Sequence, residues 1–310
     1  MTAKNVDTKI VFLLYCDLYW EPVESKLNNP ERFVLMFAPI TRTYTHSLDE
    51  AGDYDAADLS PYVRNQCVLP RSVEENLCRL RQWQKFFPGD CFDYDYHYMW
   101  DHHRDIAQMH MNKVLFDDMK AMGKLHMNGM ISCQNQRVWM PSGFGMAAMA
   151  EALWNAEADF DTVADDYFFA AFGPDGTLVR DYLQKLSDAF MPPYFRREVG
   201  DVSPEAAESM AEVPGITAEF QKVILKNLDA DLPDNQRRSW EYLDYHRQLC
   251  DLLAPTFQKL AEGEKDEAAR LFGRFCRWLQ ENEPAVADVL DVFELQSTLS
   301  RSFKAAGVIL

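Results

Sequence analysis

The fold of this chain is decided by the stretch Cys91-Phe-Asp-Tyr-Asp-Tyr-His-Tyr-Met-Trp-Asp-His-His103. Successive side chains of an extended strand point to opposite faces, so its aromatic residues share one face and Asp93, Asp95 and His97 share the other. Burying two carboxylates and an imidazole is costly unless they are paired, hydrogen-bonded or exposed to a wet cavity. The pattern therefore predicts a strand whose polar face either lines a pocket or forms a satisfied internal network.

Three further runs share this organisation, in which a β-rich segment ends in a polar, aromatic loop. The four predicted strands are Lys9–Cys16, Arg32–Ala38, Cys91–Tyr98 and Met127–Cys133. Helical sequence at Ser72–Phe86 and Met109–Met122 separates them, which indicates parallel βαβ units. Because parallel α/β proteins place their sites at the carboxyl ends of strands, we expect the polar loops to form a functional site.

The character of the sequence changes beyond about Asp188. We predict an α/β part over residues 1–190, a linker over 191–215 and a helical C-terminal domain over 216–310. Apolar residues recur at helical spacing in the last part. The helices expected there are Arg237–Leu253, Pro255–Glu262, Asp266–Asn282 and Ala285–Ala306.

Composition limits the classes of partner. The 310 residues include 31 basic and 49 acidic side chains, for a formal net charge of −18. Nucleic acids and anionic membranes are bound through basic patches, so neither is expected as a partner. No apolar run approaches the roughly 20 residues of a membrane span, and the N-terminus lacks the apolar core of a signal peptide. We expect a cytoplasmic protein, or a secreted one if an upstream segment carried a signal.

Metal and cofactor sites are not indicated. The seven cysteines are scattered without a CxxC pair, which favours reduced thiols over zinc ligands or disulfides. Asp101, His102 and His103 are neighbours, but adjacent side chains of an extended chain point apart, and we expect a solvated loop there. The run that begins at Gly143 lacks the third glycine of a nucleotide-binding loop. We predict no metal and no cofactor.

Candidate binding residues follow the other strands. Aromatic rings stack on sugar faces and polar side chains bind hydroxyls, so the mixture of residues favours carbohydrate over phosphate. The guanidinium of Arg42 could clamp a ligand carboxylate or pair with a structural aspartate. The loop after the first strand could equally be an ordinary rim. The residues concerned are Asp17, Tyr19, Trp20, Arg42, His46, Gln134 and Arg137, and Tyr44 alternates onto the same side of the second loop as Arg42 and His46.

Short motifs spaced over roughly residues 5–190 carry a family resemblance. They are Tyr15–Pro22, the loop at His46, Asn76–Trp83, Tyr94–Tyr96, Gly129 with its polar successors, Ala152–Asn155, Asp166–Phe168 and Ala171–Gly173. Together they resemble the DUF4838 family of glycoside-hydrolase-like proteins, which is related in pattern to α-glucuronidases and β-hexosaminidases. The resemblance implies an α/β fold, namely the second half of a (β/α)8 TIM-type barrel, followed by an all-α C-terminal domain.

Four strands do not close such a barrel. An open half would expose two sheet edges and an apolar interior. Either the chain is a fragment whose missing N-terminal half completes the barrel, or a partner or self-association does so. In the α-glucuronidase-like pattern the general acid comes from the earlier half, so activity of this chain alone is an open question.

The first functional hypothesis is a glycoside-hydrolase-like protein that acts on an oligosaccharide through paired carboxylates, one protonating the leaving oxygen. The catalytic candidates, in order, are Asp95, Asp93 and Asp17. The expected aromatic platform is Tyr19, Trp20, Tyr96 and Trp100, and the expected polar binding residues are Arg42, His46, His97, Gln134 and Arg137.

Two alternatives belong to other classes. The chain could be a non-catalytic carbohydrate-binding or assembly subunit, which the lack of any strand-end glutamate except Glu21 favours. It could also be a metal-dependent hydrolase built on Asp93, Asp95 and His97.

Overall fold

The computed structural model describes residues 6–309, which form two compact units. The first unit comprises residues 6–97 and 117–133, and the second comprises residues 98–116 and 134–309. The helix α2, Met109–Ala121, passes from the second unit into the first. This division differs from the predicted boundary at residue 190, because the helices before residue 190 pack with those that follow it.

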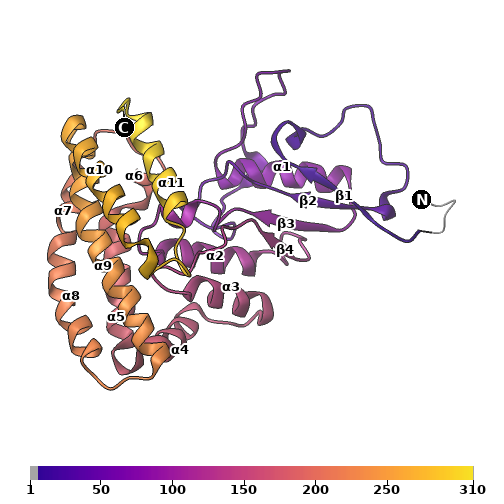
Figure 1. The fold of residues 1–310 in the computed structure, drawn as a ribbon. Helices are drawn as coiled ribbons and strands as arrows, with labels where there is room; N and C mark the ends of the chain where they lie inside the picture. The colour runs from indigo at the N-terminus through magenta and orange to yellow at the C-terminus, as the bar shows by residue number, and fades with distance from the viewer. Residues whose placement is uncertain (1–5, 310) are drawn as a thin grey trace. The chain divides into compact units, whose positions relative to one another are not determined.

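A parallel sheet of four strands, in the order β1-β2-β3-β4, forms the first unit (Figure 1). Its strands are β1 Ile10–Leu14, β2 Phe33–Phe37, β3 Cys91–Asp95 and β4 Met130–Ser132. Each lies within a predicted strand, and each pair of neighbours is parallel, as the alternation of strands and helices predicted. The mixed α/β class of the chain is thereby confirmed.

One face of the sheet is covered by helical structure. The helix α1, Val73–Phe86, begins with a capping box between Ser72 and Glu75, as the sequence predicted. The ring of Phe12 on β1 lies 5.6 Å from the ring of Trp83 on α1 and 5.0 Å from that of Phe87. The strand register places the fully buried side chains of β2 and β3 on the same face of the sheet as Phe12. They are Leu35, Phe37, Cys91, Asp93 and Asp95.

The opposite face of the sheet is apolar and only partly covered. We call it the open face. Its side chains alternate along every strand with those that face the helices, as the two-residue period of a strand requires. The open face consists of Val11, Leu13, Val34, Met36, Phe92, Tyr94 and Ile131, all of which are exposed or half-buried. Phe92 and Tyr94 therefore lie opposite Asp93 and Asp95, as the alternation predicted.

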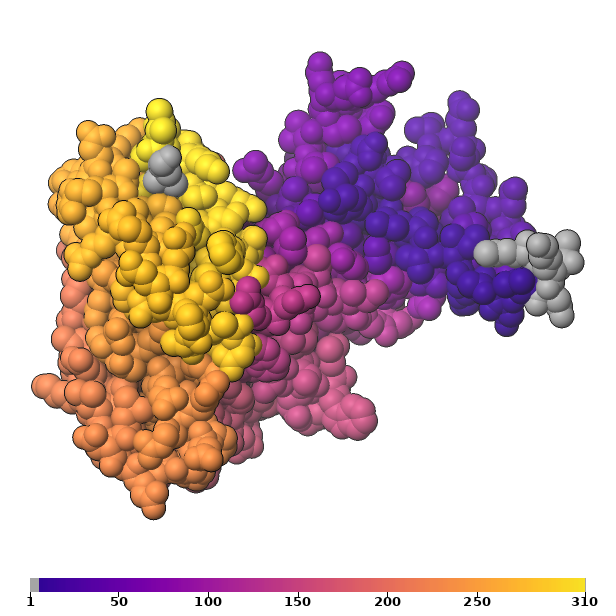
Figure 2. Space-filling view, viewed as in Figure 1, coloured from indigo at the N-terminus to yellow at the C-terminus, as the bar shows by residue number. Residues whose placement is uncertain are grey.

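Helices make up most of the second unit. They are α3 Phe144–Trp154, α4 Phe160–Phe172, α5 Gly176–Phe190, α6 Pro192–Phe195, α7 Pro204–Ala211, α8 Val213–Leu228, α9 Asp234–Ala261, α10 Lys265–Asn282 and α11 Val292–Ala305. The long helix α9 packs against α7, α8 and α10. Figure 2 shows the atoms of the orange and yellow segments, which include α9, α10 and α11, packed against one another. Buried Trp240 and Phe257 on α9 anchor that core.

Two details of the helical part differ from the sequence prediction. Residues 191–215 are not a linker, since α6 and α7 lie there and bury Tyr194, Phe195 and Met210. The helices predicted on either side of Ala254 form one continuous helix, α9, which accommodates Pro255. Within residues 6–309 no helix combines the length and the apolar character that a membrane crossing requires.

Candidate functional site

Four predicted site residues meet in the first unit, where they form a buried charge cluster with two residues that the predicted site did not include. The cluster consists of Arg42, Tyr44, Asp93, Asp95, His97 and Asp118. Asp93, Asp95, His97 and Asp118 have no exposed surface, and Arg42 and Tyr44 are also buried. The polar face of β3 is therefore turned toward the helices and away from the open face.

The guanidinium of Arg42 holds two carboxylates at once. Its Nη1 lies 3.1 Å from Oδ2 of Asp95, and its Nη2 lies 2.8 Å from Oδ2 of Asp118. Its Nε donates a hydrogen bond to the backbone carbonyl of Thr43 at 3.2 Å. Of the two roles open to Arg42 from sequence, pairing with structural aspartates is the one that these contacts display.

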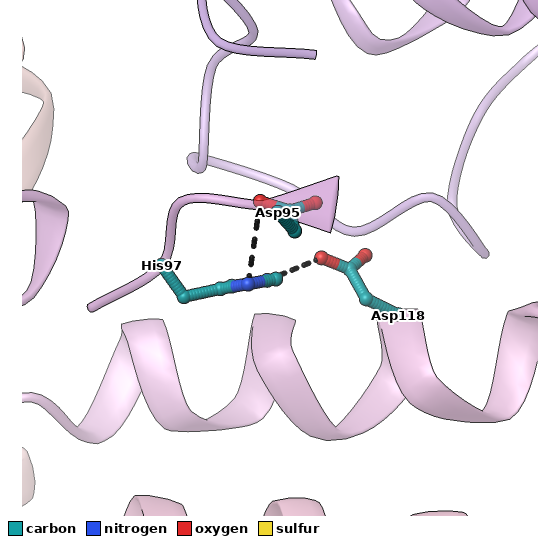
Figure 3. Close-up of side chains that lie close together, drawn as sticks. All are labelled: Asp95, His97 and Asp118. Carbon is teal, nitrogen blue, oxygen red and sulfur yellow. Dashed lines mark hydrogen bonds and ion pairs between the residues drawn. The ribbon is translucent and has the colours of Figure 1, made fainter. Parts of the chain in front are cut away.

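The imidazole of His97 lies between the same two carboxylates (Figure 3). Its Nε2 is 2.7 Å from Oδ2 of Asp118, and its Nδ1 is 3.3 Å from Oδ1 of Asp95. The carboxyl end of β3 supplies Asp95, whereas α2 supplies Asp118. The sheet and the helix are thus joined through one histidine and one arginine.

Asp95 accepts further hydrogen bonds. The phenol of Tyr44 and the backbone N–H of Tyr96, the latter at 2.6 Å, both donate to its Oδ1. The backbone N–H of Leu48 donates to Oδ1 of Asp118 at 2.6 Å. Because buried charges are costly unless they are paired and hydrogen-bonded, these contacts explain how the two carboxylates are accommodated in the interior.

The charges within the cluster shift the pKa values of Arg42 and Asp95 away from their usual values. Burial alone would lower the pKa of the Arg42 guanidinium, but Asp118 and Asp95 raise this pKa above its usual value. Burial alone would raise the pKa of Asp95, but His97 and Arg42 hold it below the usual value. Arg42 and Asp95 are therefore both ionised at neutral pH.

Asp93 behaves differently from Asp95. Neither of its carboxyl oxygens has a hydrogen-bond partner among the described residues. Burial, followed by the nearby charge of Asp95, raises the pKa of Asp93 well above its usual value. Two neighbouring carboxyl groups thus have pKa values displaced in opposite directions, with Asp93 favouring the neutral form and Asp95 the ionised form.

We expect Asp93→Asn to leave the free energy of unfolding at pH 7 within about 1 kcal/mol of the wild type, or to raise it, because a neutral amide replaces a group that must bind a proton on folding. The wild-type contribution of Asp93 falls as pH rises above the unfolded pKa of about 4 toward the raised folded value, with a slope of up to about 1.4 kcal/mol per pH unit. Urea unfolding at several pH values should show that Asp93→Asn removes this slope.

Asp95→Asn is the matched control for Asp93→Asn. It removes one of the two carboxylates that Arg42 contacts and is expected to destabilise the protein by about 3–5 kcal/mol. Equal destabilisation by the two amides would show that Asp93 is ionised in the folded protein.

A metal ion is not the natural occupant of this cluster, although Asp95, His97 and Asp118 each offer a ligand atom and those atoms lie within 4.8 Å of one another. The guanidinium of Arg42 already contacts both carboxylates. A divalent cation would have to displace it or bear its repulsion in a site of low dielectric constant. Arg42 supplies the positive charge that a metal would otherwise bring.

The candidates from the first loop do not join the cluster. Asp17 is exposed. The phenol of Tyr19 is buried and donates a hydrogen bond to the backbone carbonyl of Ala38 at 3.0 Å. The indole of Trp20 lies under the guanidinium of Arg79, whose Cζ is 4.7 Å from the ring centroid. Their sugar-binding role stays a prediction, and Tyr19 and Trp20 already have intramolecular partners.

The remaining candidates are spread over both units. His46 lies 3.6 Å from Glu74, and Tyr96 is buried after β3. In the second unit, Trp100 lies under the guanidinium of Arg301 and Gln134 is exposed. Arg137, also in that unit, is 3.2 Å from a carboxylate oxygen of Asp291 and 3.7 Å from one of Glu283. Like Arg42, it is paired with acidic side chains of its own chain.

The loop after β3 is not solvated, contrary to the sequence prediction. Residues Asp101–His103 form a 3-10 turn, and all three side chains are buried. The rings of His102 and His103 lie 3.8 Å apart, and Asp101 forms an ion pair with Arg196 at 2.6 Å. The turn brings neighbouring side chains together in a way that an extended chain would not.

The predicted site omitted Asp118 and Tyr44. Asp118 lies on the buried face of α2, three and four residues after Leu115 and Val114. An acidic residue in register with an apolar stripe is the sequence signal that could have identified it. Tyr44 alternates with Arg42 in the second loop, and that alternation was visible in the sequence.

A groove on the second unit offers a surface of a different kind. It has a volume of about 490 Å³ and is lined mainly by Trp139, Ser142, Met146, Tyr167, Ser239 and Tyr242. Trp139 is 44 % exposed. A Cβ atom added to Gly143 would lie only 2.5 Å from its ring, so the indole is supported from behind by backbone. The groove therefore presents a supported aromatic surface to solvent.

Polar groups flank this aromatic surface. The hydroxyl of Tyr242 donates a hydrogen bond to Asp288 at 2.8 Å and accepts one from Arg238 at 2.8 Å. The hydroxyl of Tyr167 accepts a hydrogen bond from the backbone N–H of Gly143 at 2.7 Å. Apolar surface with a few fixed polar groups is the usual composition of a small-molecule site.

Comparisons of the chain with protein-family models, with curated proteins and with solved structures found no match.

Proposed function

We propose that this chain is a carbohydrate-binding subunit with the second half of a glycoside-hydrolase-like (β/α)8 barrel and a helical C-terminal domain, and that it binds sugar without cleaving it by itself. The observation that carries this proposal is the contrast between the two candidate sites. Asp93 and Asp95, the first two carboxyl candidates for hydrolysis, have no exposed surface, whereas the aromatic groove on the second unit is open.

The buried cluster supports a structural role for Asp93 and Asp95. A glycosidase needs its two carboxyl groups on either side of a glycosidic bond, with room for the sugar or a water. Asp95 instead contacts Arg42, Tyr44 and His97. A sugar that reached it would have to break these contacts, and the cost of leaving Arg42 unpaired opposes this.

The groove supports binding of a neutral pyranose. The exposed face of Trp139 suits the apolar C–H face of a sugar ring. The Tyr242 and Asp288 oxygens and the Arg238 guanidinium suit its hydroxyl groups, as acceptors and donors respectively. Its volume of about 490 Å³ falls within the range of ordinary ligand pockets.

One observation favours hydrolysis as a second candidate. The pKa of Asp93 is raised and that of Asp95 is lowered, and carboxyl pairs separated in this way serve as acid and base in glycosidases. In that role Asp93 would be the general acid and Asp95 the ionised partner. This candidate requires an opening that exposes both groups to substrate.

The test of sugar binding is isothermal titration of the protein with two neutral sugars, methyl glucoside and N-acetylglucosamine. We expect saturable binding of at least one of them and a loss of at least about tenfold in Trp139→Ala, which corresponds to about 1.4 kcal/mol. Trp154→Ala is the matched control, since Trp154 is 91 % exposed and does not line the groove. Absence of binding, or equal binding by both variants, would refute the proposal.

A further inference from the structure

The open face of the sheet is an apolar surface of the first unit that the described helices leave partly exposed. It consists only of uncharged side chains, and those at its margins are substantially exposed, including Leu13 and Val11 on β1 and Ile131 on β4. Contiguous exposed apolar surface on a sheet is a mark of an interface. The net charge of −18 lies elsewhere on the molecule, so it does not oppose burial of this face directly.

The two outer strands of the sheet, β1 and β4, run in the same direction. Among the described residues, β1 pairs with β2 alone and β4 pairs with β3 alone. Unpaired edges of this kind readily accept another strand. Because all four strands are parallel and follow each other in chain order, the edge of β4 matches the edge of β1 in direction.

A two-fold axis parallel to the strands brings both sheet edges and the open face of one copy into contact with those of the other copy. It sets β4 of one copy beside β1 of the other, and the same pairing recurs on the opposite side. The result has eight parallel strands, the number at which the interior of a closed barrel is filled by side chains. Every surface that this arrangement requires is present on the chain.

We propose that a second copy of this chain covers the open face, so that two four-stranded sheets close into one eight-stranded parallel barrel. The interior of that barrel is made from the open faces of both copies. The buried charge cluster then lies between the sheet and the helices of each copy, outside the barrel interior. This arrangement is independent of sugar binding in the groove of the second unit.

Sedimentation equilibrium of the full chain tests the proposal. The expected mass is twice the 35.9 kDa of one chain. Leu13→Glu places a carboxylate on the open face, where Leu13 is 38 % exposed, and should return the mass to 35.9 kDa at the same concentration. Leu225→Glu on α8, where Leu225 is 50 % exposed, is the matched control and should leave the dimer intact.

Cross-linking then distinguishes barrel closure from other dimers. Val11→Cys and Ile131→Cys are made separately, with the half-buried Cys16, Cys67 and Cys133 replaced by serine. A short bifunctional maleimide should join the two variants in an equal mixture and should fail to join either variant to itself. Circular dichroism verifies that each variant is folded.

A wild-type chain that stays monomeric up to high micromolar concentration would overturn the proposal. A dimer that survives Leu13→Glu, or cross-linking of Val11→Cys to itself, would overturn it as well. Failure of the sugar titration would not affect these outcomes, and a monomer would not affect the titration.

Discussion

Arg42→Met should destabilise the protein by about 3–5 kcal/mol, the cost of removing one partner from a buried ion pair. The substitution leaves Asp95 and Asp118 without the cation that both contact, and neither carboxylate has any exposed surface. Methionine fills the space but provides no donor. Chemical denaturation followed by circular dichroism measures the difference in the free energy of unfolding.

Arg180→Met is the control for Arg42→Met, because Arg180 also contacts two aspartates, Asp161 and Asp165, but these are largely exposed. Exposed ion pairs contribute about 0–1 kcal/mol, so little change is expected. Adding Asp95→Asn to Arg42→Met should recover part of the loss, since the two effects are coupled. A cost below about 1 kcal/mol for Arg42→Met would mean that the cluster is open to water.

Stability should also fall in mild acid because of buried histidines in the second unit. Burial lowers the pKa of His246 from its ordinary 6.5 to about 4, and its Nε2 donates a hydrogen bond to the carbonyl of Ile106 at 2.9 Å. Burial and the adjacent His102 lower the pKa of His103 as well. Both imidazoles are neutral in the folded protein at neutral pH, whereas the unfolded chain protonates them near pH 6.5.

The difference in proton binding between the two states determines whether the free energy of unfolding rises or falls with pH. Between pH 6.5 and the folded pKa the unfolded state binds more protons, so the free energy of unfolding decreases as pH falls. For His246 the total is on the order of 3 kcal/mol by pH 4, at about 1.4 kcal/mol per pH unit. Urea titrations at pH 7, 6, 5 and 4 measure the wild-type loss.

His246→Gln serves as the comparison for the acid effect, since an amide can also donate to the carbonyl of Ile106. We expect it to lower stability at pH 7 and to flatten the dependence below pH 6.5. The buried Asp93 acts in the opposite direction over the same range, so the double variant with Asp93→Asn separates the two contributions. A slope that is unchanged in His246→Gln would contradict the assignment.

The four strands could be predicted because alternation of side chains is a local property. The same alternation correctly placed Asp93 and Asp95 opposite Phe92 and Tyr94. Alternation alone does not show which face of the strand packs against the helices, because the two-residue period is the same whichever face is buried. The polar face of β3 was expected to line a pocket or to form a network, and the contacts of Asp95 form a network.

The residues that pair within that network could not be predicted from local sequence patterns. Arg42 and Asp118 are 76 residues apart, and no local rule pairs them. The buried turn at His102 was likewise missed, because its burial comes from tertiary packing and not from its own sequence. Helical periodicity also did not predict that Pro255 lies inside α9.

The claim that this chain binds carbohydrate without cleaving it is tested most directly by one experiment on the purified protein. A β-linked oligosaccharide of glucose or N-acetylglucosamine is titrated calorimetrically, and the same samples are assayed for newly formed reducing ends. The account predicts saturable binding that depends on Trp139 and no increase in reducing ends. Release of reducing ends that disappears in Asp95→Asn, with that variant shown to be folded, would contradict it and would assign catalysis to the buried cluster.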